Sequence, residues 1–259
     1  MGEDRLVGRR VLVMGASAGI GRVVGQRLCA AGAHVAFASR RKGVCAEAAE
    51  EAQGTAIGLS CDVTDESQCR QVVDDTVEQL GGLDDVVYST GAISIIALAT
   101  ADTEWWRRTF ETNVMGAALL TKFALPHVEP ALGSMIYLSS VASIGPPWPG
   151  IGVYTATKAA LNRMIETWRV EVPEVGFTRI FVGPTADAGT GTAMDMSALE
   201  HMARWAGLGV ASGAMDTPGA IADAVELVLR SDSRIADVTV APKDPPLPWA
   251  GVDSAAVGV

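Results

Sequence analysis

The sequence predicts an α/β fold, a single doubly wound parallel sheet between two layers of helices (a three-layer α/β/α arrangement). Short apolar runs of strand length alternate with longer helical patterns along the chain, which is typical of parallel sheets. A cluster of glycines follows the first apolar run and permits a tight turn into the first helix. The composition agrees, because 49% of the residues are hydrophobic, 19% are charged and 28 of the 259 are glycine, as suits buried strands joined by tight turns.

One domain over residues 1–259 is expected at this length. The formal net charge of −10 disfavours nucleic acid and anionic membranes as partners, because both are bound by clustered lysine and arginine. The four cysteines show no C-x-x-C spacing and the three histidines lie far apart, so neither a disulfide framework nor a metal site is predicted. No apolar run approaches the ~18 residues of a membrane span, and the acidic start lacks an apolar leader. We therefore expect a cytoplasmic protein.

The first strand is expected over Val11–Met14, and a helix to about Ala31 follows it. Between them the glycines have the spacing G-x-x-x-G-x-G. Such a turn lets the backbone approach a pyrophosphate, whose charge is stabilised by the free N–H groups at the start of the helix. The residues expected to bind a cofactor here are Gly15, Ser17, Ala18, Gly19, Ile20 and Gly21.

The second strand, His34–Ser39, ends at two arginines, Arg40 and Arg41. An acidic residue at this position would accept hydrogen bonds from the adenosine ribose, whereas Ser39 followed by arginines suits a 2′-phosphate. We therefore expect NADP(H) rather than NAD(H), with Arg40 as the favoured contact because it lies nearer the strand end, and with Arg41 able to share or replace that contact. The alternative is a solvated basic turn.

The remaining strands and helices continue the alternation. Asp62 and Val63 follow the third strand and could contact adenine, or Asp62 could simply begin a turn. Thr90 and Gly91 follow the fourth strand, where a nucleotide could pass close to the backbone. The expected elements are a helix over Val44–Ala52, a strand over Ala56–Ser60, a helix over Asp65–Leu80, a strand over Asp84–Tyr88, and helices from Thr103 and from Glu111 to His127.

Asn113 lies inside the helical pattern that starts at Glu111, where asparagine is a poor helix former. Its amide could hold a structural water, or it could simply be exposed. Pro126 and Pro130 are expected to close that helix.

The stretch Met135–Lys158 predicts a buried strand ending at Ser139 and Ser140, a loop rich in proline and glycine, and a helix that begins at Tyr154 and runs to about Val172. Tyr154 and Lys158 are four residues apart and share one helix face. Forming a phenolate at pH 7 costs about 4 kcal/mol, and a nearby cation favours it. Tyr154 could then act as general acid or base toward an alcohol or ketone, with Ser140 donating a hydrogen bond to the substrate oxygen. An ordinary surface pair is the alternative for Tyr154 and Lys158.

A strand over Phe177–Val182 precedes Pro184 and Thr185, and the chain ends with a helix over Pro218–Arg230 and a strand near Val238–Val240. Residues 185–216, rich in methionine and glycine, are expected to form a substrate lid, and the proline-rich tail over 242–259 is expected to lie extended. The expected substrate walls offer hydrophobic surface with one nearby cation, Arg204: they are Ile93, Ile95, Ile96, Pro147, Trp148, Met194, Met196 and Trp205.

Taken in order, the glycine turn, Asn113, Ser140 and Tyr154-x-x-x-Lys158 resemble the short-chain dehydrogenase/reductase family over about residues 9–240. The resemblance implies a Rossmann fold in which the tyrosine is the acid/base and the serine orients the substrate oxygen. It also implies that Lys158 holds the nicotinamide ribose and lowers the tyrosine pKa, while Asn113 supports a proton-relay water. Self-association through the helices beginning near Asn113 and Tyr154 is implied as well.

The chain departs from the family pattern in several places. Ser89-Thr90-Gly91 stands where Asn-Ala-Gly is usual, and Pro184-Thr185 stands where Pro-Gly is usual. The loop from Ser140 to Tyr154 is one residue longer than usual, and Ser139 or Ser143 could compete with Ser140. Thr185, Thr190 or Thr192 could meet the nicotinamide. The overall expectation is a cytoplasmic, homo-oligomeric oxidoreductase that transfers hydride between NADP(H) and a largely apolar ketone or secondary alcohol. The alternative is a dinucleotide-binding regulator or scaffold without turnover.

Overall fold

The computed structural model describes residues 5–93, 95–186, 200–201, 204–205, 207–208 and 214–243. Within these ranges one seven-stranded sheet has the order β3-β2-β1-β4-β5-β6-β7, and every neighbouring pair is parallel. This confirms the predicted doubly wound Rossmann-like sheet, whose strand order reverses between β1 and β4. The strands are β1 (Arg10–Met14), β2 (His34–Ser39), β3 (Ala56–Ser60), β4 (Asp85–Tyr88), β5 (Ser134–Ser140), β6 (Gly176–Val182) and β7 (Asp237–Val240).

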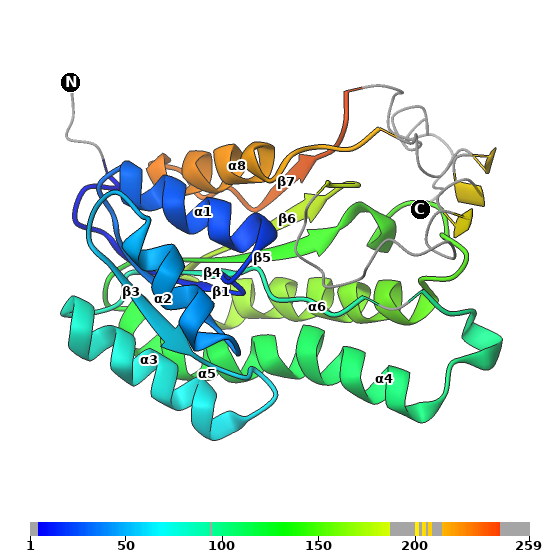
Figure 1. The fold of residues 1–259 in the computed structure, drawn as a ribbon, viewed down its shortest axis with the longest axis horizontal. Helices are drawn as coiled ribbons and strands as arrows, with labels where there is room; N and C mark the ends of the chain where they lie inside the picture. Colours follow the sequence, from blue (N-terminus) through cyan, green and yellow to red (C-terminus); the bar gives the residue numbers. More distant parts are fainter. Residues whose placement is uncertain are drawn as a thin grey trace.

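Helices cover both faces of the sheet (Figure 1). Alternate residues of β1 show why: Val11 and Val13 pack into the core with α1, α2 and α8, while Leu12 and Met14 pack into the core with α3, α5 and α6. This alternation places two apolar layers on one strand. The helices are α1 (Gly19–Ala30), α2 (Lys42–Glu50), α3 (Glu66–Leu80), α4 (Thr103–Phe110), α5 (Gly116–Val128), α6 (Gly152–Glu171) and α8 (Pro218–Arg230).

Three local features differ from the sequence prediction. Pro126 does not close α5 but lies inside it; it falls in the last turn before Val128, where few further helical hydrogen bonds remain to be lost. Residues Glu111–Met115, predicted as ordinary helix, form a π-helical turn between α4 and α5. Helix α6 begins at Gly152, two residues before Tyr154. Short 3₁₀ turns lie at Leu98–Thr100 and Val141–Ser143.

A buried carboxylate fixes the start of the three central strands. Asp85, which is 0% exposed, accepts hydrogen bonds from Nε and Nη2 of Arg9 at 2.9 and 2.8 Å and from the backbone N–H of Ser134 at 2.8 Å. The side chain therefore links the entry to β1 with the first residues of β4 and β5. The glycine turn, Thr90, Gly91 and Ser140 lie at the other ends of these three strands.

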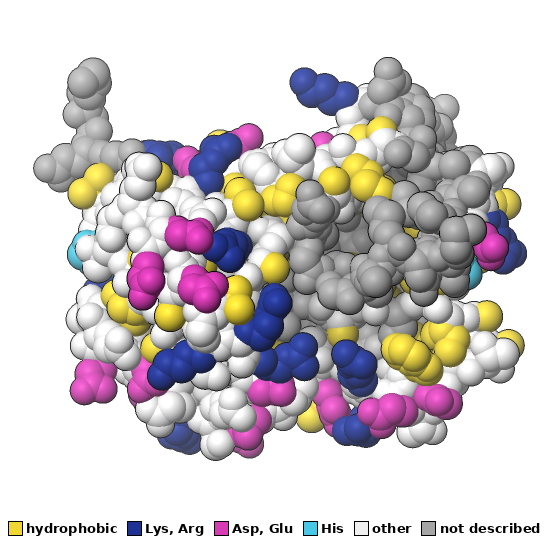
Figure 2. Space-filling view, viewed as in Figure 1, with side chains coloured by type: hydrophobic (Ala, Val, Ile, Leu, Met, Phe, Trp, Pro, Cys, Tyr) yellow, Lys and Arg dark blue, Asp and Glu magenta, His cyan; other side chains and the backbone are white. Residues whose placement is uncertain are grey.

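Parts of two predicted segments lie outside the described residues. In the expected lid over 185–216, residues 187–199 and several after them are not described, and these include Met194 and Met196. The tail is described only as far as Lys243. Within the described chain, no helix combines the length and apolar character needed to cross a membrane. On the face drawn in Figure 2, acidic and basic side chains are interspersed.

Candidate active site

The glycine turn lies between β1 and α1, at the carboxyl edge of the sheet. A Cβ on Gly15, whose φ is +90°, would meet the backbone and side chain of Thr90 at 2.9 Å. A Cβ on Gly21 would lie 2.5 Å from the Gly15 carbonyl oxygen, so only glycine fits at either position. Ala18, the residue before α1, offers no side-chain cap. The first N–H groups of α1 are therefore left for another acceptor, as a pyrophosphate site requires.

Arg41 crosses from the end of β2 to this turn. Its Nη2 donates a hydrogen bond to Oγ of Ser17 at 2.9 Å, and its backbone N–H donates to Oγ of Ser39 at 3.0 Å. Arg40 is exposed. Of the two arginines, the structure thus brings Arg41 to the glycine turn, although the sequence favoured Arg40. Gly19 and Ile20 are the first residues of α1 and directly follow Ala18.

The next two strand ends differ in what they offer a ligand. Asp62 accepts hydrogen bonds from the backbone N–H and hydroxyl of Thr64 at 3.0 and 2.9 Å, so its carboxylate serves the turn that follows β3. Val63 is buried in the core between the sheet and helices α3, α5 and α6. Thr90 adjoins Gly15, and a Cβ on Gly91 would lie 3.7 Å from both Oδ1 of Asn113 and Nζ of Lys158.

Ser140, Tyr154 and Lys158 meet where β5 ends and α6 begins. The Ser140 hydroxyl lies near enough to Tyr154 to act on the pKa of its phenol. Nζ of Lys158 lies 5.7 Å from the centre of the Tyr154 ring and donates a hydrogen bond to the Leu138 carbonyl at 2.7 Å. The helical spacing that the sequence predicted thus brings a phenol, a hydroxyl and an ammonium to one edge of the sheet.

Burial dominates the protonation of this group. It raises the pKa of Tyr154 to about 12, against the opposing effect of the Ser140 hydroxyl. It lowers the pKa of Lys158, which is 3% exposed, to about 8. The pKa of Tyr154 thus lies above its ordinary value, because desolvation of the phenolate is the largest effect on it. At pH 7 Tyr154 is a neutral proton donor and Lys158 is mostly charged.

Asn113 is fully buried, and its amide is engaged by the protein. Oδ1 accepts from the backbone N–H of Ala92 at 2.7 Å, while Nδ2 donates to the Ala92 carbonyl and to Oγ1 of Thr157, each at 2.9 Å. The side chain thus ties the loop after β4 to the π turn and to α6, rather than lying exposed. Thr157 was not singled out from the sequence, because only the tertiary fold brings it to Asn113.

Ser139 and Ser143, which could compete with Ser140, are both hydrogen-bonded to Asn162, a residue that the sequence analysis missed. Oγ of Ser139 donates to Oδ1 of Asn162 at 2.6 Å, and Nδ2 of Asn162 donates to Oγ of Ser143 at 2.9 Å. Of the three serines, Ser140 is the one that acts on the pKa of Tyr154. A usable signal existed in the spacing, because Asn162 lies four residues after Lys158 and continues the same helix face.

An apolar cluster adjoins Tyr154. The ring packs with Ile93 and Ile95 against a group of buried residues: Val141, Ala142, Trp148, Ile151, Phe181 and Trp205. The rings of Trp148 and Trp205 lie 5.4 Å apart. The Trp205 indole N–H donates to the Pro149 carbonyl at 2.7 Å, whereas the buried N–H of Trp148 has no partner within the described residues.

Other predicted wall residues lie apart from this cluster. Pro147 and Arg204 are exposed; the exposed proline is explained by its place at the tip of the loop after β5. Ile96 is only half-buried, and its N–H donates to the Gly150 carbonyl at 2.6 Å. After β6, Thr185 pairs with Asp216 in a short parallel bridge, and the Pro184 carbonyl accepts from the Asp216 N–H at 2.8 Å. Thr190 and Thr192 lie outside the described residues.

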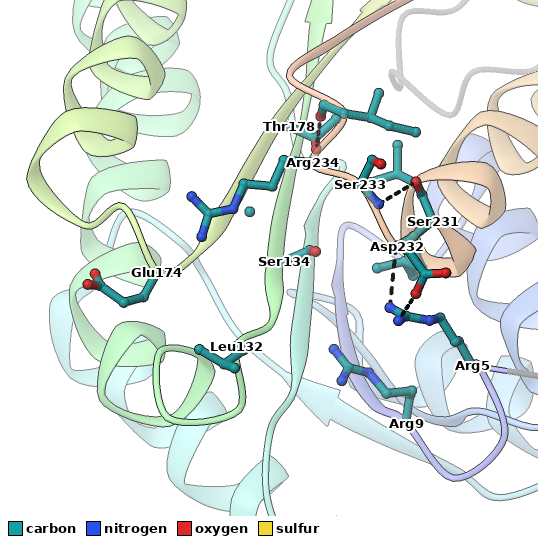
Figure 3. A pocket seen from close by; sticks show the side chains of 14 residues that line it. Arg5, Arg9, Leu132, Ser134, Glu174, Thr178, Ser231, Asp232, Ser233 and Arg234 are labelled. Carbon is teal, nitrogen blue, oxygen red and sulfur yellow. Dashed lines mark hydrogen bonds and ion pairs between the residues drawn. The ribbon is translucent and has the colours of Figure 1, made fainter.

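A hollow of about 430 Å³ lies at the opposite, amino-terminal edge of the sheet (Figure 3). Its walls come from strand starts and the loop before β7, including Arg9, Ser134, Thr178 and Arg234. Arg5 in this wall is paired with Asp232. None of the predicted site residues lines the hollow, so it is separate from the candidate active site. In the described part of the chain, no three His, Cys, Asp or Glu side chains are arranged to hold a metal ion.

Comparison with known proteins agrees with this geometry. The sequence model described as short chain dehydrogenase matches residues 9–203. The 11-beta-hydroxysteroid dehydrogenase A of Sesamum indicum is 34% identical over 187 residues, which cover 70% of this chain and 53% of that protein. The chain thus spans about half the length of this curated relative.

Solved structures share the fold. A short-chain type dehydrogenase/reductase from Mycobacterium marinum has a TM-score of 0.80 and 26% identity, with 91% of this chain and 95% of that chain covered. An alcohol dehydrogenase from Thermococcus sibiricus, complexed with 5-hydroxy-NADP, has a TM-score of 0.76 at 21% identity, with 90% and 95% covered, and shows a likeness of fold alone. From the match to the family's sequence model over residues 9–203, together with the strand order and the glycine turn, the chain belongs to the short-chain dehydrogenase/reductase family.

Proposed function

We propose that this protein is an NADP(H)-dependent oxidoreductase that interconverts a largely apolar ketone and the corresponding secondary alcohol. The observation that carries the proposal is the convergence of Tyr154, Ser140 and Lys158 beside the apolar cluster, at the sheet edge that also bears the glycine turn. Family membership supports the reaction type. Bound NADP(H) supplies or accepts the hydride.

The residues present fit a dinucleotide. Gly15 and Gly21 leave space that a side chain would fill, and the uncapped start of α1 offers N–H donors to the pyrophosphate. Arg41, held by Ser17 and Ser39, is placed to receive a 2′-phosphate. For the two ends of the dinucleotide we assign further contacts. Asp62 and Val63 would lie near the adenine, and the residues near the nicotinamide would be Thr90, Gly91, Lys158, Pro184 and Thr185.

Tyr154 would move the proton. With its pKa raised to about 12, the phenol keeps its proton at neutral pH and can donate it to the oxygen of a carbonyl as that oxygen gains negative charge. Ser140 would donate a second hydrogen bond to the same oxygen. In our assignment Lys158 holds the nicotinamide ribose, and its buried ammonium favours the phenolate that forms when Tyr154 gives up its proton. Asn113 keeps the loop after β4 and helix α6 together around this group.

The substrate class follows from the walls. Ile93, Ile95, Trp148 and Trp205 give the Tyr154 side of the site an apolar surface. The buried Trp148 N–H has no partner in the described residues, and an acceptor oxygen on the substrate would satisfy it. A relative is named as a hydroxysteroid dehydrogenase. Rigid apolar ketones such as oxosteroids are therefore the first class to assay.

Replacing Tyr154 by phenylalanine tests the reaction directly. Tyr154→Phe keeps the ring against Ile93 and Ile95 but removes the proton donor, so turnover should fall by about 10² or more while the Kd for NADPH stays nearly unchanged. The measurement is NADPH oxidation with a panel of apolar ketones, with NADPH binding followed by fluorescence. Near-normal turnover by the variant would contradict the assignment of Tyr154 as the general acid/base. NADPH binding by the wild type without oxidation of any ketone would favour a regulator over an enzyme.

Cofactor choice should depend on Arg41. Arg41→Ala should weaken NADPH binding about tenfold to hundredfold and leave NADH nearly unchanged, because a charge-assisted hydrogen bond to phosphate contributes about 1.5 to 3 kcal/mol. Arg40→Ala is the matched control and should have a smaller effect. The measurement is the Kd of each variant for both cofactors. Equal losses for NADH and NADPH in Arg41→Ala would mean that the arginine only shapes the turn.

The buried ammonium of Lys158 should leave a mark on the pH dependence of stability. Because its pKa falls from 10.5 to about 8 on folding, the folded protein carries the full cost of the buried charge below pH 8 and loses that cost as pH rises to about 10.5. The stability of the wild type relative to Lys158→Met should therefore rise over this window, by up to about 3 kcal/mol. Urea unfolding at several pH values measures the difference. Lys122→Met, which removes an exposed surface lysine, is the control, and a flat difference for Lys158→Met would contradict the assignment.

We also propose that the protein forms a homo-oligomer through α5 and α6, as the family resemblance implies. Large apolar side chains at the surface support this, since Met115 and Val170 are 56% and 81% exposed beside these helices. Light scattering should give a molar mass that is a multiple of 26.9 kDa, and Met115→Glu should lower it. A wild-type mass of one chain would contradict the proposal.

A further inference from the structure

Helix α6 carries a third polar residue on the face that bears Tyr154 and Lys158. Asn162 follows Lys158 by four residues and is only 7% exposed, so its side chain turns toward the sheet as the other two do. It plays no part in the proton transfer proposed above. Its contacts nevertheless lead to Ser140.

Asn162 holds both flanks of Ser140. On one side, Oγ of Ser139 donates to Oδ1 of Asn162 at 2.6 Å. On the other, Nδ2 of Asn162 donates to Oγ of Ser143 at 2.9 Å, and the Ser143 hydroxyl donates to the Ser140 carbonyl at 2.6 Å. An unbroken chain of short hydrogen bonds therefore runs from α6 to the backbone of Ser140.

Ser140 needs such an anchor because it stands where regular structure ends. It is the last residue of β5 and begins the 3₁₀ turn Val141–Ser143. Within the turn, its hydroxyl accepts only the Ala142 N–H at 3.2 Å. Val141 and Ala142 in the turn are buried in the apolar cluster, whereas the chain beyond the turn is exposed at Ile144, Pro146 and Pro147.

We propose that Asn162 is a positioning residue, which acts through Ser143 to set the Ser140 hydroxyl against Tyr154. The inference rests on the proposed function, because it concerns how accurately the serine meets the substrate oxygen. The amide belongs to the same helix as Tyr154, so it couples the positions of the two groups. A misplacement of about 1 Å can cost a reaction roughly a hundredfold, which makes such a coupling important for turnover.

A purely structural role for Asn162 gives different expectations. If the amide only provided hydrogen-bond partners for the buried hydroxyls of Ser139 and Ser143, both hydrogen bonds would contribute to stability to a similar extent. A positioning amide would affect turnover through the branch to Ser143 and much less through the branch to Ser139. The helix itself stays anchored in either case, because the Asn162 carbonyl accepts from Nη1 of Arg179 at 3.3 Å whatever the side chain.

The test compares single changes on the two branches. Ser143→Ala removes the hydroxyl that donates to the Ser140 carbonyl, and Asn162→Asp removes the amide N–H that donates to this hydroxyl. Each should lower kcat by about tenfold to hundredfold with little change in KM or in the Kd for NADPH. Ser143→Thr keeps a hydroxyl at this half-buried position and should restore kcat to within about threefold of wild type. Ser139→Ala removes a comparable hydrogen bond to the same amide and is the matched control, expected to keep most of kcat.

The readouts are steady-state kinetics with one accepted ketone, NADPH binding by fluorescence, and thermal unfolding. Equal kcat for Ser143→Ala and wild type would overturn the inference, as would equal losses in Ser139→Ala and Ser143→Ala or a failure of Ser143→Thr to restore activity. A folded Ser143→Ala variant is recognised by its NADPH binding. If the wild type turns over no ketone, the proposed function fails and this inference fails with it. If the wild type is active and the Ser143→Ala and Asn162→Asp variants keep its kcat, only the inference is overturned.

Discussion

The parallel register of β1, β4 and β5 is the constraint on which the site depends. Because the strands run the same way, their carboxyl ends lie at one edge, and the residues that follow them meet there. A slip of one residue would exchange the two faces of a strand and turn its apolar side chains away from their core. The buried link from Arg9 to Asp85 and Ser134 opposes such a slip at the other edge. The geometry of the site is therefore fixed partly by residues that never approach it.

Helix α6 converts that edge into a chemical site. Its polar face presents a phenol, an ammonium and an amide in successive turns, and each finds a partner on β5 or the turn after it. Two physical effects compete at this face: burial disfavours charge on both Tyr154 and Lys158, while their nearness favours opposite charges. Burial shifts both pKa values in this structure, which leaves the tyrosine protonated at pH 7 while the lysine stays mostly charged. The balance suits proton donation better than proton removal.

The fold and the position of the catalytic face could be predicted from the sequence because both depend on local spacing. Alternating apolar runs indicated the parallel sheet, and the four-residue interval indicated that Tyr154 and Lys158 share a face. What could not be predicted depends on tertiary surroundings. Sequence distance favoured Arg40, but the direction of a side chain at a helix start decides which arginine reaches Ser17. The rise in the tyrosine pKa was missed for the same reason, since burial cannot be read from neighbouring residues. The π turn that carries Asn113 gave no sequence signal beyond one poor helix former.

The strand order affects how the chain folds. Val11 pairs with Asp85, while the intervening chain must first fold outward into β2 and β3. Closing a loop of that length lowers the entropy of the chain before any contact compensates for the loss. Sheets that pair strands distant in sequence therefore fold slowly. Thr90 reaches Gly15 only after this closure. During synthesis the glycine turn therefore emerges early but stays unfinished until the chain has grown past β4, so a nucleotide would meet a complete cradle only late in folding.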